Sequence, residues 1–151
     1  VEPGYGLKLG YYAQEHETLD VNQSVLDNMM SAAPNLDDTS ARTVLGSFLF
    51  SGDDVYKSAS VLSGGEKTRL ALATLVVSGA NVLLLDEPTN NLDPASREEI
   101  LGAIRSYVGA IILVTHDAGA VQALDPDRVL ILPDADEDIW SDEYLELVEL
   151  A

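Results

Sequence analysis

The fold of this chain is decided by the stretch VLLLDEPTNNLD at residues 82–93. Four apolar residues run from position 82 to 85 without alternation, a pattern typical of a strand buried on both faces of a parallel sheet. Asp86 and Glu87 follow where this strand would leave the core. Ligand chemistry in open α/β sheets gathers at the carboxyl ends of strands, so both acids are candidate site residues. A pair of solvated loop acids would give the same pattern, and this alternative stays open here.

The alternation of side chains along a strand predicts different roles for Asp86 and Glu87. One carboxylate can hold a cation while the other faces a reacting group. Pro88 breaks the strand. Asp93 followed by Pro94 predicts an acidic N-cap and a proline at the first helical position, so we expect a helix over residues 94–107.

A second uninterrupted apolar strand is predicted at residues 110–115, and His116 follows it. A strand, a crossover helix and another strand form a βαβ unit, whose parallel strands end at one sheet edge. His116 should therefore lie on the same edge as Asp86 and Glu87, although a lone histidine at a strand end is more often structural. We expect a third strand at residues 129–132.

The stretch LSGGEKTRLALA at residues 62–73 predicts a helix start. Ser63 with Glu66 three residues later fits a capping box, which by itself would mean only a well-capped helix. Each of Gly64 and Gly65 gives up about 1 kcal/mol relative to alanine in a helix, and this indicates that something approaches the backbone closely. Because bare N–H groups and the helix dipole attract anions, we interpret this start as a phosphate site.

The N-terminal third predicts a strand at residues 7–13 and two helices at residues 22–33 and 39–50. Gln14 follows the strand, where its side-chain oxygen can reach a metal ion or the water bound to it. A surface amide is the alternative for this glutamine. The two helices would form a small helical insert between Gln14 and Ser63.

The composition limits the classes of function. With 26 acids against 8 bases the net charge is −18, which argues against direct nucleic-acid binding by this chain. Solubility is the favoured explanation, and a salt-adapted source is the other. The absence of cysteine excludes disulfides and thiolate metal sites and is compatible with the cytoplasm. Without a run of 18 apolar residues or a charged leader, we expect neither a membrane span nor a signal peptide.

The segment from residue 133 contains eight acids and no base. Trp140, Tyr144, Leu147 and Val148 nevertheless recur at helical spacing. Ser141 is a suitable N-cap, and the acids that follow it suit the helix dipole. We therefore predict an ordered docking helix.

In their order and spacing, these motifs resemble the nucleotide-binding domain of an ABC ATPase. The matching segments are Gln14 (Q-loop), residues 62–67 (signature motif), residues 82–87 (Walker B), residues 90–93 (D-loop) and residues 115–116 (H-loop). Glu66 stands where transporters usually carry glutamine. Within the superfamily the chain resembles the ABC-F group, soluble proteins with two ATPase domains in one chain. Chromosome-maintenance ATPases insert a long coiled coil that the short separation of Gln14 and Ser63 does not accommodate.

The resemblance implies a role for each site residue, with ATP and Mg²⁺ as cofactors. Asp86 would hold Mg²⁺ through water, and Gln14 would sense the metal and the γ-phosphate. Glu87 would orient and deprotonate the attacking water, and His116 would contact the γ-phosphate. The signature residues Ser63, Gly64, Gly65 and Glu66 would bind ATP held by the other ATPase domain of the same chain, and Asp93 would bridge to that partner.

The resemblance also implies an action on the ribosome, since ABC-F proteins are mostly translation factors and some give antibiotic resistance. Because the resemblance to the ABC-F group extends into the C-terminal tail, it suggests that the chain is part of the second ATPase domain of a longer protein. A transporter cassette and a non-catalytic interaction module are the alternatives.

One part of the family pattern is missing, because no Gly-Lys pair of a Walker A loop occurs in the sequence. We expect that loop to lie before Val1, which would leave the 151 residues inactive alone. The expected fold class is α/β, a partial P-loop NTPase domain with a mostly parallel sheet and a helical subdomain. An exposed sheet edge would favour self-association or partial stability.

The expected division of the chain has four parts. They are a strand leading to the Q-loop (1–14), the helical subdomain (15–62), the signature helix with the ATPase core (63–132) and an acidic segment with the docking helix (133–151).

Overall fold

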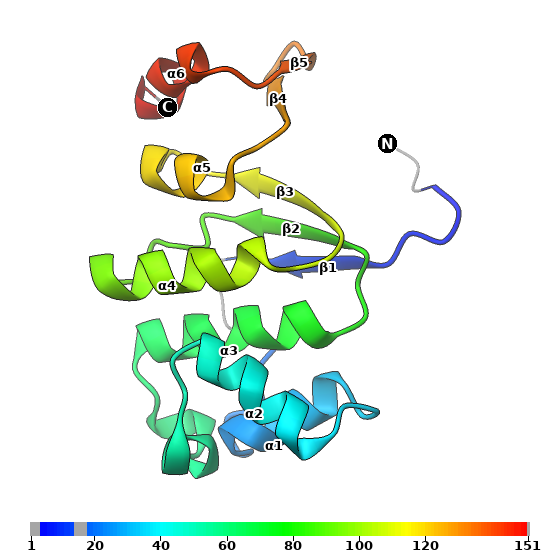
Figure 1. Cartoon of the computed structure of the whole chain (residues 1–151), viewed down its shortest axis with the longest axis vertical. Coiled ribbons are helices and arrows are strands. Elements are labelled where there is room, and N and C mark those ends of the chain that lie inside the picture. The colour runs from blue at the N-terminus through cyan, green and yellow to red at the C-terminus, as the bar shows by residue number, and fades with distance from the viewer. Residues whose placement is uncertain (1–3, 14–17, 151) are drawn as a thin grey trace.

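The computed structural model describes residues 4–13 and 18–150, and its centre is a three-stranded parallel sheet (Figure 1). The strands are β1 (Leu9–Tyr12), β2 (Val82–Asp86) and β3 (Ala110–Val114), in the order β1-β2-β3. Asp86 is paired in register with Val114. The predicted parallel α/β sheet is therefore confirmed, and the ends of β2 and β3 lie side by side.

One face of this sheet is covered by α3 (Gly64–Val77) and α4 (Pro94–Arg105). Leu83 and Leu85 of β2 point to this face and are each 1% exposed. Gly10 of β1 allows the close packing, since a Cβ there would lie 2.9 Å from Leu83 Cδ2. These contacts hold the sheet and the two helices in one hydrophobic core.

The opposite face of the sheet is exposed within the described chain. Tyr11 and Leu9 are 51% and 54% exposed, and Ile112 of β3 is 53% exposed. The prediction that residues 82–85 are buried on both faces is therefore wrong within the described chain, because only alternate residues of β2 are fully buried, and the residues of β3 are exposed or half-buried. The apolar run indicates a strand that can be buried on both faces, but burial also requires a second covering layer.

The helical part lies on the side of α3 that faces away from the sheet (Figure 1). It contains α1 (Val25–Ala32), α2 (Asp38–Ser47) and two short 3₁₀ turns, Gly52–Tyr56 and Ala59–Val61. Both predicted helices are confirmed, but α2 stops three residues early. Phe48 is its C-cap and Leu49 takes the left-handed conformation with φ 68°, which ends the helix.

The C-terminal part differs more from the predictions. After α5 (Ala118–Leu124), the strand β4 (Arg128–Ile131) pairs antiparallel with β5 (Asp136–Ile139) in a separate two-stranded sheet. The strand β5 was not predicted because its sequence, Asp-Glu-Asp-Ile, has little of the composition that favours strands.

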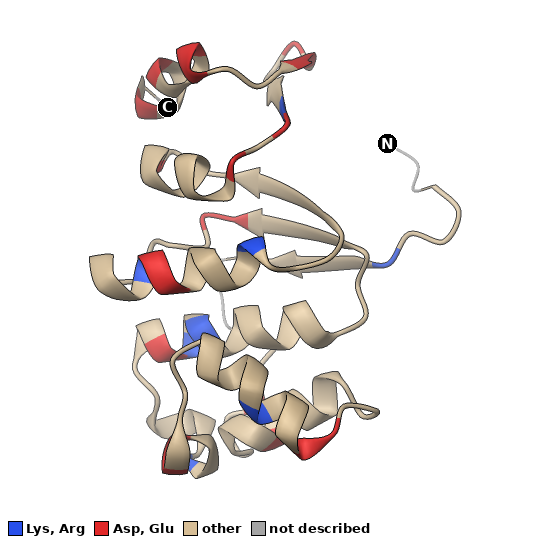
Figure 2. Ribbon diagram, viewed as in Figure 1, with Lys and Arg blue, Asp and Glu red and all other residues tan. Residues whose placement is uncertain are grey.

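A helix is present as α6 (Leu145–Leu150), after a 3₁₀ turn over Asp142–Tyr144, but none of its residues is buried, so the predicted docking is not seen within the described chain. Ser141 stands at the N-cap, yet among the described residues its side chain makes no capping hydrogen bond. Figure 2 shows acidic residues concentrated in this region. Within residues 4–13 and 18–150, no helix is both long and apolar enough to cross a membrane.

Candidate functional site

The candidate site begins where β2 ends. Asp86 is its last residue, and Glu87 takes the left-handed conformation with φ 49°. The Glu87 backbone N–H donates to the Val114 carbonyl at 2.8 Å, which ties the turn to the end of β3. Because Glu87 has left the strand, this turn, rather than strand alternation, separates its side chain from that of Asp86.

The Glu87 carboxylate is held by the segment that follows β3. Its Oε1 lies 2.5 Å from His116 Nδ1 and accepts the His116 backbone N–H at 3.1 Å. Its Oε2 accepts the Thr115 hydroxyl at 3.1 Å. The Glu87 side chain is 16% exposed, whereas that of His116 is 61% exposed. The structure thus brings Glu87 and His116 together, as expected from their places after adjacent parallel strands.

Asp117 forms a second set of contacts behind this pair. Its Oδ1 caps α5 by accepting the backbone N–H groups of Gly119 at 2.9 Å and Ala120 at 3.3 Å. Its Oδ2 accepts the hydroxyl of the buried Thr89 at 3.1 Å and lies 3.3 Å from Arg97 of α4. Asp117, Thr89 and Arg97 were not predicted; an aspartate before a short helix was the one local signal available.

Asp93 is the N-cap of α4, as predicted, and Pro94 is the first helical residue. Its carboxylate accepts the Ser96 backbone N–H at 3.0 Å and the Ser96 hydroxyl at 2.7 Å. These hydrogen bonds favour the charged form, the backbone bond most strongly, and they lower the pKa of the Asp93 carboxyl. In this conformation Asp93 serves its own helix.

Ser63 is the N-cap of α3, and the predicted capping box is confirmed. The Ser63 hydroxyl accepts the Glu66 backbone N–H, and the Glu66 carboxylate accepts the Ser63 backbone N–H, each at 3.2 Å. A Cβ on Gly65 would lie 2.9 Å from the Asn91 carbonyl oxygen, whereas a Cβ on Gly64 would meet nothing of the described chain within 4 Å. The close approach predicted for the glycine pair thus occurs at Gly65, and the chain itself supplies it.

The loop between Glu87 and Asp93 connects the two parts of the site. The Asn90 backbone N–H donates to the Glu87 carbonyl at 3.4 Å, and the next residue, Asn91, packs on Gly65. The exposed start of α3 and the Glu87 turn are therefore joined by a few residues of ordered loop.

The predicted metal ligands are Asp86 and Gln14. Asp86 is the last residue of β2 and belongs to the alternate positions of the strand that face the exposed side of the sheet. Gln14 lies outside the described residues. No group of three His, Asp or Glu side chains that could hold a metal ion occurs among the described residues. Mg²⁺ commonly takes only one or two carboxylates together with waters and substrate phosphates. The single carboxylate of Asp86 fits that kind of shared site.

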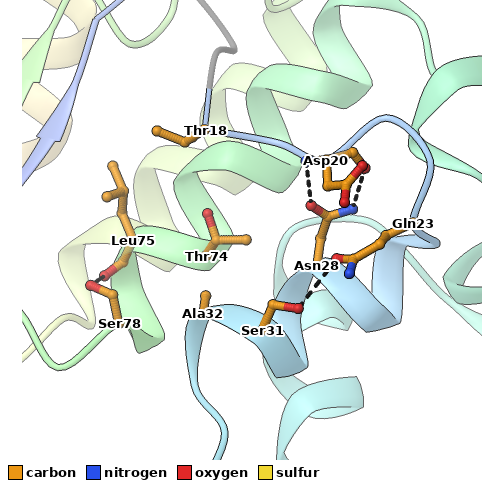
Figure 3. Close-up of a pocket in the computed structure, with 9 residues that line it drawn as sticks. All are labelled: Thr18, Asp20, Gln23, Asn28, Ser31, Ala32, Thr74, Leu75 and Ser78. Carbon is orange, nitrogen blue, oxygen red and sulfur yellow. Dashed lines mark hydrogen bonds between the residues drawn. The ribbon is translucent and has the colours of Figure 1, made fainter.

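A separate polar hollow of about 410 Å³ lies between α1 and α3 (Figure 3). Its most buried polar residue, Asn28, bonds the backbone N–H and carbonyl of Asp20 and the Ser24 carbonyl, at 2.9–3.0 Å. Ser31 bonds Gln23 at 3.2 Å. These groups bond one another and hold the helical part together, so we place the candidate chemistry at Glu87 instead.

Comparison with known sequences matches the chain to one family model and to several curated proteins. The family model described as ABC transporter matches residues 3–90. The ATP-binding protein YdiF of Bacillus subtilis is 42% identical over 154 residues, covering 97% of this chain and 24% of that protein. The ATP-binding protein YheS of Haemophilus influenzae is 43% identical over 118 residues, covering 78% and 18%. Protein GCN20 of Saccharomyces cerevisiae is 33% identical over 119 residues, covering 78% and 16%.

Solved structures share the fold at low sequence identity. The dimeric post-hydrolysis structure of the ATP-binding cassette MJ0796 with ADP and Pi has a TM-score of 0.70 at 21% identity, covering 88% of this chain and 63% of that one. A bacterial Atm1-family ABC exporter with ATP bound has a TM-score of 0.71 at 21% identity, covering 94% and 26%.

The chain therefore belongs to the ABC family of ATP-binding cassettes. Within that family it is an ABC-F ATPase sequence, since YdiF, YheS and GCN20 are members of the ABC-F group. It spans about a quarter or less of the length of these curated relatives.

Proposed function

We propose that this chain is the part of an ATPase domain that carries the water-activating residues of a longer ABC-F protein. That protein would bind and hydrolyse ATP between two ATPase domains. The observation that supports the proposal is the Glu87 carboxylate, which three hydrogen-bonding contacts hold at the carboxyl end of the sheet beside Asp86. A fixed carboxylate at this place suits a general base for water.

Asp86 would hold Mg²⁺ through water, together with Gln14, and the bound ion would neutralise phosphate charge. Glu87 would orient the attacking water and take its proton. His116 would contact the γ-phosphate, and its exposed ring supports access to a nucleotide. Since phosphoryl transfer depends on positioning and electrostatics, these residues need only hold fixed geometry at the moment of reaction.

The start of α3 would serve the nucleotide of the opposite domain. Ser63 and Gly64 are exposed, and the space in front of Gly64 is open within the described chain. N–H groups at a helix start bind phosphate oxygens. Ser63 and Gly64, together with Gly65 and Glu66, would contact ATP carried by the other ATPase domain. Asp93 would bridge the two domains.

The isolated chain would be inactive, because its 151 residues contain no Gly-Lys pair to grip a triphosphate. The other ATPase domain of the longer protein would be its main partner. Action on the ribosome in the cytoplasm, as a translation or antibiotic-resistance factor, rests on the resemblance to the ABC-F group. Separation from the rest of the protein would leave an exposed sheet edge, which favours self-association or partial stability.

The test is ATP hydrolysis by the full-length protein that contains this chain. Glu87→Gln removes the base but keeps the size of the side chain, so turnover should fall by about 10²- to 10⁴-fold while ATP binding persists. Glu137→Gln is the matched control, since Glu137 lies in β5 and not at the site. Unchanged turnover in Glu87→Gln would refute the proposal. Steady ATP hydrolysis that copurifies with the isolated 151-residue chain would refute it too.

A transporter cassette is the second candidate, supported by the fold shared with an ABC exporter. A neighbouring gene for a membrane partner would favour it. A second signature motif in the same full-length protein would favour the ABC-F proposal.

A further inference from the structure

The Thr115 hydroxyl lies between the Glu87 carboxylate and the start of α5. Its oxygen accepts the Asp117 backbone N–H at 3.0 Å and lies 3.1 Å from Glu87 Oε2. A hydroxyl has one proton to donate, and a carboxylate only accepts when it is ionised. Because an N–H already points at the Thr115 oxygen, the hydroxyl proton is directed at Glu87.

We propose that Thr115 is a positioning residue that sets the plane of the Glu87 carboxylate, an inference that rests on Glu87 acting as the base. Both contacts from His116 go to Oε1. With one oxygen held, the carboxylate can still rotate, since the last torsion of a glutamate side chain has a broad energy minimum. A bond to Oε2 removes that rotation and determines which lone pair remains for water.

The support behind Thr115 is itself fixed. Asp117, whose N–H orients the hydroxyl, caps α5 with one carboxylate oxygen. Its other oxygen receives the Thr89 hydroxyl and faces Arg97 of α4. The position of Thr115 is therefore set through Asp117 by α5 and α4. A donor that is already fixed loses less conformational entropy when it forms its hydrogen bond.

The first experiment measures amide hydrogen exchange at His116 in this 151-residue chain. The His116 N–H is protected by Glu87 Oε1, so its exchange rate reports whether the carboxylate stays in place. Thr115→Val keeps the shape and removes the hydroxyl, and exchange should become about tenfold faster. Thr115→Ser keeps the hydroxyl and should stay within about twofold of the parent chain. Unchanged exchange in Thr115→Val overturns the inference.

The second experiment measures kcat and KM for ATP in the full-length protein. A positioning role predicts that Thr115→Val lowers kcat by about 10-fold or more, leaves KM nearly unchanged, and is rescued by Thr115→Ser. Thr43→Val is the control, because the Thr43 hydroxyl bonds only the Thr39 carbonyl within α2 among the contacts described. Equal loss in Thr115→Val and Thr115→Ser overturns the positioning role.

The two readouts separate this inference from the proposed function. A full-length parent protein without ATPase activity would refute the proposed function, while His116 exchange would still decide whether Thr115 holds Glu87. Should Thr115→Val fail to fold because a methyl group replaces the hydroxyl, Thr115→Ala removes the same hydroxyl and leaves a smaller side chain. Parent-like exchange at His116 in that variant overturns the inference too.

Discussion

The carbonyl oxygen of Asn91 lies 2.9 Å from the place that a Cβ on Gly65 would occupy. The loop that follows Glu87 therefore packs directly on the first turn of α3. Only a residue without a side chain allows this approach. Through this contact, the loop that follows the catalytic candidate Glu87 packs on the start of α3, which we propose to bind the nucleotide of the opposite domain.

Gly65→Ala should destabilise the chain. The added methyl group meets a backbone oxygen, which cannot move aside like a side chain, so we expect a loss of about 1–3 kcal/mol of unfolding free energy. Gly64→Ala is the matched control: its methyl group meets open space within the described chain, and alanine favours helix. Urea denaturation of both variants measures the difference. Equal stability would show that Asn91 does not press on Gly65 in solution.

Ser63→Arg tests the proposed action across domains in the full-length protein. The large charged side chain should block the start of α3, so the opposite ATP site should lose activity while nucleotide binding at this domain's own site persists. Ser63→Ala controls for the lost capping bond, which contributes about 1 kcal/mol. Site-resolved nucleotide binding provides the measurement. Equal loss at both sites in Ser63→Arg would contradict the trans assignment.

Asp93→Asn tests the charge at the start of α4. Hydrogen bonds from Ser96 lower the pKa of Asp93 in the folded state, so its charged form stabilises the fold. That contribution is present above the unfolded-state pKa of about 3.9 and is lost as pH falls through the lower folded-state value. Asparagine also caps helices but does not titrate here.

Thermal melting from pH 6 to pH 2 compares Asp93→Asn with the parent chain. The variant should start less stable and lose less stability in acid. Parallel stability curves would show that the capping charge of Asp93 makes no contribution.

Leu83→Ala and Ile112→Ala test whether the sheet is covered on one face. Leu83 is 1% exposed and packs under α3 and α4, so its truncation should cost about 2–5 kcal/mol. Ile112 is 53% exposed on the other face, and its truncation should cost about 1 kcal/mol or less. Chemical denaturation of the 151-residue chain measures both. Comparable losses would mean that the second face is buried in solution, as by self-association.

Local signals made much of the fold predictable. The caps at Ser63 and Asp93 depend on residues three positions apart, so they can be recognised in the sequence. The meeting of Glu87 with His116 follows from the parallel pairing of the two strands of one βαβ unit, which end at the same sheet edge. By contrast, the early end of α2 depends on a left-handed Leu49, a conformation that leucine rarely takes.

The sequence alone determined the type and order of the main elements, because apolar periodicity and capping residues act over a few positions. It also placed both carboxylates at a strand end. Only the tertiary structure decided that one sheet face is covered, that β4 pairs with β5, and that Thr115 and Asp117 stand behind Glu87. These features depend on packing between residues distant in sequence, and no local pattern specifies which surfaces will meet.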